Sequence, residues 1–263
     1  MEAASLSRNA WYYHAKQTEE PVEMKAKIEA VLLESPYYGY KRVTKELHYQ
    51  GEMVNHKRIY KIMGSYHLLQ QRKSRKPKTT NSNHNYKVYA NEVKYLGEVL
   101  PYQVWVADIT YIPIGTTWAY LALIMDQAGK KIVGWHMDTS LHRSICIEAL
   151  NLALRENKAP EYHHSDRGRQ YCSNEYIALL KQNHITPSMA DVGMSVDNPY
   201  AESLNRSIKV EEVYLNAYES FAEAYESIKK YIAVYNSKRL HSSLGYVSPL
   251  TFEANYQLIV SKI

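Results

Sequence analysis

The sequence has little cysteine and no long apolar run, and both absences narrow the class of protein. Only two cysteines, Cys146 and Cys172, occur among the 263 residues. They are too few for a disulfide framework, and neither belongs to a C-x-x-C pair of the kind found in zinc or redox sites. We therefore expect two buried or half-buried thiols.

Membrane and secretory features are equally scarce. The longest apolar run, Trp118 to Met125, is far shorter than the roughly 18 residues that a membrane span needs. Residues 1–13 lack the charged-then-apolar order of a signal peptide. These features predict a cytoplasmic protein with no membrane partner.

Composition excludes a disordered or collagen-like chain and leaves a basic front end. Hydrophobic residues make up 45%, charged residues 22% and aromatic residues 12% of the sequence, which is typical of a folded soluble protein. The first hundred residues carry 17 Lys and Arg against 10 Asp and Glu, whereas the remainder carries 15 against 17. This asymmetry predicts a polyanion partner for the front end.

Three amphipathic patterns in the front end predict three short helices. Apolar residues recur at helical spacing from Pro21 to Pro36 and from Tyr40 to Gln50. A third pattern starts at the N-cap candidate Asn55 and runs to Met63. Its outer face carries Lys57, Arg58 and Lys61. A basic third helix is typical of a helix-turn-helix that binds DNA, although any small helical bundle with a solvated basic face would show the same periodicity.

A dense basic run follows the third predicted helix. Five of the seven residues from 72 to 78 are basic, namely Arg72, Lys73, Arg75, Lys76 and Lys78. We interpret residues 72–98 as a linker between two domains. The basic run is either a solvated, flexible connector or a strap that binds DNA phosphates, because each neutralised phosphate releases a counterion.

Beyond Pro101 the pattern changes to strands, and then helices and strands alternate. Segments 103–112, 118–125 and 131–137 are rich in Val, Ile, Trp and Tyr and are separated by glycine-containing breaks. Helices are expected at 142–156 and 174–183, short strands near 162–165 and 185–189, and an almost wholly helical tail from residue 198 onward. This order predicts an α/β fold with helices on both faces of the sheet.

Two aspartates stand out in the predicted sheet. Asp108 lies in a strand whose two faces are both mostly apolar, where an unpaired carboxylate is costly. It is therefore either paired with Lys or Arg or a metal ligand. Asp166 follows a short strand, at the edge where α/β proteins collect their sites, although an Asp-Arg-Gly turn is also ordinary.

A third acid, Glu202, lies on a predicted helix that Pro199 opens. Helical spacing places it in a polar stripe with Asn198, Asn205 and Lys209. The opposite, buried stripe is formed by Ala201, Leu204 and Ile208. The polar stripe is either part of a site or a solvated helix face.

These three acids, with 35 residues between the last two, resemble the D, D-35-E active site of integrase-core transposases in the retroviral-integrase superfamily. The chain resembles still more closely the product of the longer reading frame, orfB, of the bacterial insertion-sequence-three family. The motifs of the body are Val104-Trp-Val-Ala-Asp-Ile-Thr-Tyr111, Ile132-Val-Gly-Trp135, His164-Ser-Asp-Arg-Gly-Arg-Gln-Tyr171, Asp197-Asn-Pro-Tyr-Ala-Glu-Ser203 and Tyr235-Asn-Ser-Lys-Arg-Leu-His-Ser-Ser-Leu-Gly-Tyr-Val-Ser-Pro249. The motifs of the front end are Gly39-Tyr-Lys-Arg-Val43 and Val54-Asn-His-Lys-Arg-Ile-Tyr60.

The resemblance implies an RNase H-like integrase catalytic core with an N-terminal helix-turn-helix domain and a helical C-terminal tail. The expected segments are a junction at 1–22, a helix-turn-helix-like DNA-binding domain at 23–71, the basic linker at 72–98, the catalytic core at 99–214 and a helical C-terminal region at 215–263. The sequence departs from the family pattern at Arg169, where a small polar residue is expected, and at Leu204 and Asn205, where aromatics are.

The implied activity is metal-dependent cleavage and 3′-end strand transfer at the inverted-repeat ends of an insertion sequence. Asp108, Asp166 and Glu202 would be catalytic and would hold two Mg²⁺ or Mn²⁺ ions, since three carboxylates form a hard oxygen site. Lys209 is expected to hold a DNA phosphate nearby, and Arg169 is a further candidate for DNA contact. No zinc is implied.

The implied partners are double-stranded DNA, both terminal repeats and target, and further copies of the chain assembled on it. The upstream orfA product, separate or fused, is another candidate partner, and the bacterial nucleoid is the expected place of action. Two rival interpretations remain at this point: a plain RNase H-like nuclease, and a DNA-binding regulator whose catalysis is lost.

Overall fold

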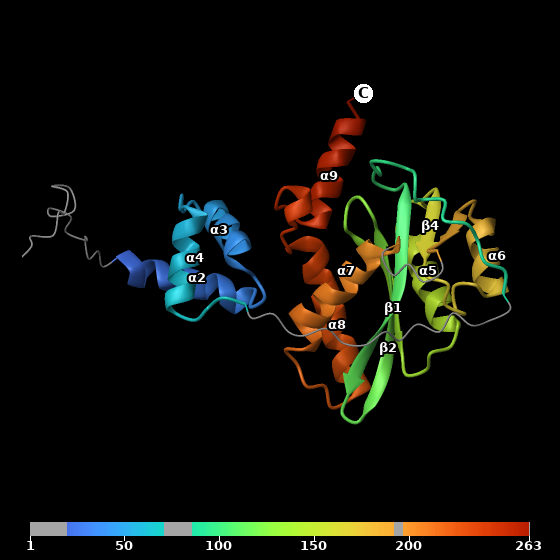
Figure 1. The fold of residues 1–263 in the computed structure, drawn as a ribbon, viewed down its shortest axis with the longest axis horizontal. Helices are drawn as coiled ribbons and strands as arrows, with labels where there is room; N and C mark the ends of the chain where they lie inside the picture. The colour runs from blue at the N-terminus through green and yellow to red at the C-terminus, as the bar shows by residue number, and fades with distance from the viewer. Residues whose placement is uncertain (1–19, 71–85, 192–196, 263) are drawn as a thin grey trace, which may run out of the picture. The chain divides into compact units, whose positions relative to one another are not determined.

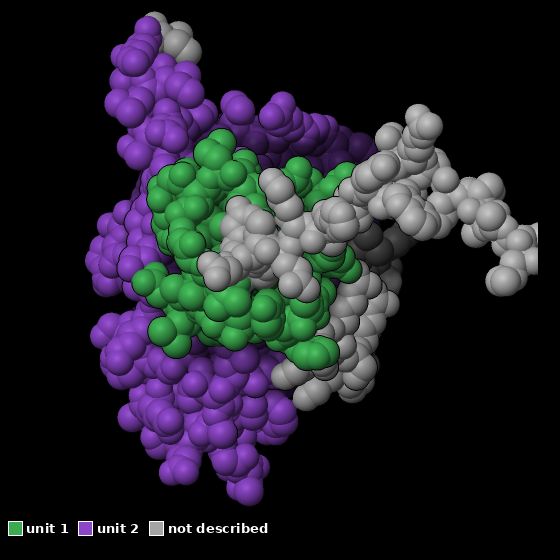
Figure 2. Space-filling model, turned by 90° about the vertical axis from the view of Figure 1, so that its left-hand side faces the viewer, with its two compact units in different colours: residues 1–73 green, residues 74–263 purple. Residues whose placement is uncertain are grey.

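A computed structural model describes residues 20–70, 86–191 and 197–262 of the protein (Figure 1). The chain divides into two compact units, Met1–Lys73 and Ser74–Ile263, which Figure 2 distinguishes by colour. The basic run at 72–78 lies outside the described residues, so its two interpretations stay open.

In the described part of the first unit, residues 20–70, three helices occur: α2 (Glu20–Glu34), α3 (Tyr40–Tyr49) and α4 (His56–Ser65). All three match the predicted helical patterns to within a few residues. The predicted N-cap is confirmed, because the Asn55 side chain accepts a hydrogen bond from the backbone N–H of Lys57 at 2.8 Å. The helices meet through one buried residue set, which includes Ile28, Val43, Leu47, Ile59 and Met63.

The second unit is organised around one five-stranded sheet. Its strands are β1 (Val104–Ile114), β2 (Thr117–Asp126), β3 (Ile132–Asp138), β4 (Tyr162–Ser165) and β5 (Thr186–Met189). They lie in the order β3-β2-β1-β4-β5. The β3–β2 and β2–β1 pairs are antiparallel, whereas β4 is parallel to both β1 and β5. This arrangement is that of an RNase H-like core.

Strand β1 is the third of the five strands in this order and pairs with β2 along one edge and with β4 along the other. Its hairpin with β2 turns at Gly115, whose φ of +51° suits glycine. The register places Asp108 opposite Leu123 of β2, and Val106 opposite His164 of β4. The predicted strand with two apolar faces is thereby confirmed, and Asp108 lies in the middle of the sheet.

Helices cover both faces of the sheet, as predicted. Figure 1 shows α5 (Ser144–Glu156) and α6 (Asn174–Gln182) on one side of β1, and α7 (Pro199–Ile208) and α8 (Phe221–Ser237) on the other. The side chains of β1 alternate between them: Trp105 belongs to the cluster under α5 and α6, and Val106 to the cluster under α7 and α8.

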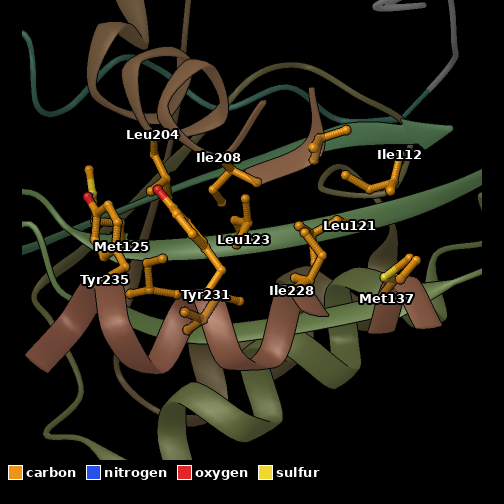
Figure 3. Close-up of a cluster of buried hydrophobic side chains, with 14 of the residues drawn as sticks. Ile112, Leu121, Leu123, Met125, Met137, Leu204, Ile208, Ile228, Tyr231 and Tyr235 are labelled. Carbon is orange, nitrogen blue, oxygen red and sulfur yellow. The ribbon is translucent and has the colours of Figure 1, made fainter. Parts of the chain in front are cut away.

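The α7/α8 face is closed by a continuous apolar cluster (Figure 3). Leu204 and Ile208 of α7 lie over Leu121 and Leu123 of β2, and Ile228 of α8 completes the contact. The expected buried stripe of α7 is therefore confirmed. Its burial fixes which residues of the helix are left to face β1.

The α5/α6 face depends on a close approach between backbones. A Cβ atom on Gly134 of β3 would lie 2.3 Å from the carbonyl oxygen of Ala149 in α5, a distance that no side chain tolerates. Cys146 and Cys172 are buried as free thiols on the same face, in agreement with the expectation for the two cysteines.

The tail is less regular than the predicted helical stretch. Helix α7 passes directly into a π-helix, η2 (Lys209–Val213), and α8 is followed by a short 3₁₀ helix, η3 (Ser242–Leu244), before α9 (Pro249–Val260). Between α8 and α9 the backbone folds back through an isolated β-bridge from His241 to Val247. The expectation of almost continuous helix is wrong there, because Gly245 adopts a positive φ of +71° and Pro249 opens a new helix. Within the described residues no helix is long and apolar enough to cross a membrane.

Candidate active site

Asp108 lies half-buried in the central strand with a polar neighbour that is not a cation. Its Oδ2 accepts a hydrogen bond from Nδ2 of Asn205 on α7 at 2.7 Å, and its Oδ1 accepts one from the backbone N–H of Ile109 at 2.9 Å. Among the described residues it takes part in no ion pair. Of the two alternatives left by the sequence, a pairing with Lys or Arg is therefore not found among the described residues.

Asp166 immediately follows β4, at the edge of the sheet next to the middle of β1. Its Oδ1 accepts a hydrogen bond from the backbone N–H of Gly168 at 2.8 Å. A Cβ atom on Gly168 would lie 2.9 Å from the same oxygen. Glycine therefore lets the turn close on the Asp166 carboxylate and fixes where it points.

Glu202 is exposed in the first turn of α7, and the start of this helix is anchored to two strands. Nδ2 of Asn198 donates to the carbonyl oxygen of Ala107 at 3.0 Å, next to Asp108 in β1. Nε2 of His164 in β4 lies 3.0 Å from the carbonyl oxygen of Asp197. These two contacts bring the Glu202 turn to the strands that carry the aspartates.

The three carboxylates influence one another electrostatically. The pKa of Asp108 is raised to about 7, first by burial and then by the negative charge of Asp166, and Glu202 raises it further, whereas the hydrogen bonds from Ile109 and Asn205 lower it. Within the described part of the chain, no three His, Cys, Asp or Glu side chains are gathered closely enough to hold a metal ion. The acids thus share one region without reaching ligation distance, as expected for like charges with no cation between them.

The donor set of this region fits a hard divalent cation. All three side chains offer carboxylate oxygens. The Oδ1 atom of Asn205, next to Asp108, is buried and has no hydrogen-bond donor in the described structure. A buried acceptor without a donor, beside mutually repelling carboxylates, suits a cation or its bound water.

The other predicted site residues are distributed over both units. Lys209 is half-buried at the point where α7 widens into η2, and Arg169 is exposed in the turn after Asp166. On α4 the side chains of Lys57, Arg58 and Lys61 are all exposed, opposite the buried Ile59 and Ile62.

Comparison with known families agrees with the geometry. Residues 98–195 and 183–249 match two families described as Integrase core domain, and residues 18–77 match one described as HTH-like domain. The transposase for insertion sequence element IS904 of Lactococcus lactis subsp. lactis is 35% identical over 248 residues, covering 91% of this chain and 98% of the relative. The chain belongs to the insertion-sequence-three family of DDE transposases.

Two further relatives match most of the transposase. The insertion element IS600 uncharacterized 31 kDa protein of Shigella sonnei is 34% identical over 254 residues, covering 94% of this chain and 93% of that protein. Transposase InsF for insertion sequence IS3A of Escherichia coli K12 is 33% identical over 221 residues, covering 82% of this chain and 76% of that protein. As a member of this family the transposase is a divalent-metal-dependent polynucleotidyl transferase that acts on DNA.

Sequence reasoning missed two features of the transposase's site. It placed Asn205 in the polar stripe of α7 but assigned it no contact, and its spacing of three residues from Glu202 was the available signal. It also gave no role to Arg239, which forms a buried ion pair with Glu211 in η2. Nothing in the local pattern indicates this pair, because its members are 28 residues apart.

Proposed function

We propose that the transposase cuts one DNA strand at each inverted-repeat end of an insertion sequence and joins the freed 3′ end to target DNA, with Asp108, Asp166 and Glu202 as its catalytic residues. The observation that carries this proposal is the half-buried carboxylate of Asp108, which lacks an ion pair among the described residues and has its pKa raised by burial and by the negative charges of the other two acids. A carboxylate of this kind is poorly suited to a structural role and well suited to holding a cation.

The three acids would hold two Mg²⁺ or Mn²⁺ ions. When bound, such ions activate the attacking oxygen and stabilise the leaving oxygen of an in-line displacement at phosphorus. Asn205 orients Asp108 through its bond to Oδ2. The nucleophile is water during cleavage and a DNA 3′-hydroxyl during joining, so no protein side chain forms a covalent intermediate.

The basic residues would contact different parts of the DNA. Exposed Lys57, Arg58 and Lys61 on α4 suit readout of the terminal repeat, because the corresponding helix of a helix-turn-helix enters the major groove. Lys209 and Arg169 lie close in sequence to Glu202 and Asp166 and suit phosphates near the reacting strand. The run containing Arg72, Lys73, Arg75, Lys76 and Lys78 would add phosphate contacts that carry no base information.

We further propose that the transposase works as a homo-oligomer that pairs two element ends, in the bacterial cytoplasm where its DNA lies, with the orfA product as a separate or fused partner. Two ends must be cut and joined together, so at least two active sites have to be assembled on one DNA complex.

A strand-transfer assay tests the chemistry. Duplex oligonucleotides with the terminal repeat and Mg²⁺ are expected to give joined products as well as 3′-end cleavage. Nicking without joining would favour a plain RNase H-like nuclease, and repeat binding without any cleavage would favour a regulator that has lost catalysis. Either result would overturn the proposal.

Competition between labelled repeat and scrambled duplex tests the division of DNA contacts. Replacing Lys57, Arg58 and Lys61 by Gln is expected to abolish the preference for the repeat. Replacing the five basic residues of 72–78 by Gln should instead weaken binding to both duplexes and flatten the salt dependence, by about 0.9 in log–log slope for each lost phosphate contact. An unchanged slope would return that run to the solvated-connector interpretation.

A further inference from the structure

A buried ion pair joins the segment that follows α8 to the C-terminal end of α7, the helix that carries Glu202. Arg239 is 3% exposed and Glu211 is 6% exposed. The guanidinium binds the carboxylate through two contacts, Nε to Oε2 at 2.6 Å and Nη2 to Oε1 at 2.5 Å. A buried pair of this kind is weakly stabilising compared with well-packed apolar residues, so its presence calls for a role other than stability.

The remaining polar atoms of the pair are engaged by neighbours from three elements. The Tyr231 hydroxyl of α8, whose ring lies in the apolar cluster of Figure 3, donates to Oε2 of Glu211 at 2.8 Å. Nη1 of Arg239 lies 2.9 Å from Nε2 of His241, and Nη2 donates to Oγ of Ser207 in α7 at 3.4 Å. We call Arg239, Glu211, Tyr231 and His241 the tail clamp.

The tail clamp acts on an unusual piece of backbone. Glu211 lies in the π-helix η2, which continues α7 without a break, and Ser207 lies in the last turn of α7 itself. Short π-helical segments are rare and occur frequently at functional sites. Here the wider turn begins at Lys209, so whatever fixes η2 also fixes the direction in which Lys209 leaves the helix.

Helix α7 is therefore held at both ends. Asn198 ties its first residue to β1 beside Asp108, and the tail clamp ties its last turn to α8 and to the segment after it. Glu202 and Asn205 lie between these two attachments. A rotation of α7 would move both residues away from Asp108, and the double attachment opposes such a rotation.

We propose that the tail clamp is a positioning device for the catalytic helix: Arg239 and Glu211 set the rotation of α7 and the direction of Lys209, so that Glu202, Asn205 and the DNA phosphate meet Asp108 correctly. This inference rests on the proposed roles of Glu202 and Lys209. The four clamp residues are positioning residues, because none of them touches the three acids in the structure's described contacts.

The test separates positioning from stability in the full-length chain. The double variant Glu211→Leu with Arg239→Met replaces the pair by apolar side chains, which should leave the melting temperature close to that of the wild type. Its affinity for the terminal repeat should stay within a few-fold. Its single-turnover joining rate on saturating repeat DNA should fall about 10- to 100-fold, because small misplacements of reacting groups have large effects on rate.

A matched control removes a different ion pair of the same unit. Lys131 and Glu253 form a half-buried pair at 2.8 Å that does not involve α7. The variant Lys131→Met with Glu253→Leu should join ends at the wild-type rate. If the clamp double variant folds and also joins at the wild-type rate, the tail clamp is only structural and the proposal is wrong.

A milder variant covers the case in which the double variant does not fold. Tyr231→Phe keeps the ring in the cluster and removes one hydrogen bond to Glu211. It should keep its melting temperature close to that of the wild type and its repeat affinity unchanged, but join about 3- to 10-fold more slowly, a loss on the scale of one ordinary hydrogen bond. A Tyr231→Phe variant with an unchanged joining rate would overturn the proposal.

Two comparisons distinguish this inference from the proposed active site. Glu202→Gln should be inactive in joining, and if it is not, the assignment of the acids fails whatever the clamp does. Lys209→Gln should cost less in the clamp-variant background than in the wild type, because residues that act through one another are not additive. If Glu202→Gln is inactive but the effects of Lys209→Gln and the clamp variant on the joining rate are fully additive, the clamp does not act through Lys209. The assignment of the acids is then unaffected.

Discussion

The two faces of the sheet bury polar groups in opposite ways. On the α5/α6 face a neutral polar pair is buried: His163 of β4 lies with Nε2 2.9 Å from the hydroxyl of Tyr176 on α6. The α7/α8 face has charged groups instead: Asp108 has no ion pair among the described residues, and Glu211 and Arg239 form a buried ion pair.

This difference distinguishes the α5/α6 face, which packs against the sheet, from the α7/α8 face, which includes the helix that carries Glu202. On the α5/α6 face, the close packing of α5 against Gly134 fixes the position of that helix. The buried His163 on the same face is neutral. The α7/α8 face carries charges whose burial is costly, and each of them lies on or against the helix that carries Glu202. On the α7/α8 face the buried charges of Glu211 and Arg239 thus lie next to the helix to which we assign a catalytic residue.

The largest expected effect is on chemistry and comes from the α7/α8 face. Asp108→Asn keeps the side-chain shape and removes the charge that would hold a cation, so joining and cleavage should fall at least about a thousandfold. Repeat binding should stay within a few-fold. The melting temperature should not drop, because the substitution removes a half-buried carboxylate that the other two acids repel. Strand-transfer and thermal-unfolding measurements check both. Near wild-type joining would show that the acid assignment is wrong.

The next largest effect is on stability and comes from the opposite face. Gly134→Ala forces β3 and α5 apart and should lower the free energy of unfolding by about 3 kcal/mol or more, as read from chemical denaturation. Gly64→Ala in α4 is the matched control, since its Cβ would meet only Cδ1 of Leu69 at 3.7 Å. If both substitutions lowered the free energy of unfolding by similar amounts, the contact between Gly134 and α5 would not be unusually close-packed.

A pH effect sharpens the contrast further. Burial lowers the pKa of His163 to about 3 from its usual value of 6.5. At this group the unfolded chain therefore binds more protons than the folded chain between these values, so the contribution of His163 to stability falls as the pH drops through that window. From pH 7 to pH 5 this contribution falls by about 2 kcal/mol. Asp108, whose pKa is raised to about 7 by burial and by the other acids, contributes in the opposite direction in both the wild type and the variants.

The double variant His163→Phe with Tyr176→Phe leaves no unpaired hydroxyl and no titrating ring, so it should be spared this loss. Denaturation midpoints at the two pH values, with Tyr176→Phe alone as the control that keeps the histidine, measure the difference. If the denaturation midpoints of the wild type and the double variant changed equally with pH, His163 would not be buried in its neutral form.

The smallest expected effect comes from Asn205, a neutral residue on the α7/α8 face. Asn205→Ala removes the hydrogen bond that orients Asp108 and should slow joining about tenfold, with stability almost unchanged. Asn183→Ala at the end of α6 is the control on the other face and should leave the joining rate alone. If Asn205→Ala joined normally, Asp108 would be positioned by the strand alone.

Most of the fold follows from local patterns, and the site follows only in part. A run rich in Val, Ile, Trp and Tyr at 103–112 predicts β1 as a strand that is apolar on both faces, and helical spacing around Leu204 predicts α7, because both patterns record which side chains face a core. Asp108 was also marked by its apolar surroundings. The family resemblance, rather than spacing alone, brought the three acids together.

The features that sequence reasoning missed are contacts between distant segments. A basic residue such as Arg239 is usually solvated, so composition gives no reason to bury it against Glu211 28 residues earlier. The π-helix at Lys209 was also unpredicted, because one wider turn leaves the apolar period on either side almost unchanged. The same holds for the turn at Gly245, where helix was expected to continue.

The order of these parts along the chain has a consequence for synthesis. A ribosome makes β1 with Asp108 first, Asp166 after β4 next, then Glu202, and Arg239 only after α8 is complete. A chain that stops before residue 202 can pair its strands but lacks the third acid, and one that stops before residue 239 lacks the residue that steadies α7. On the proposed assignment of the three acids, a product truncated before Glu202 would therefore be unable to cut DNA.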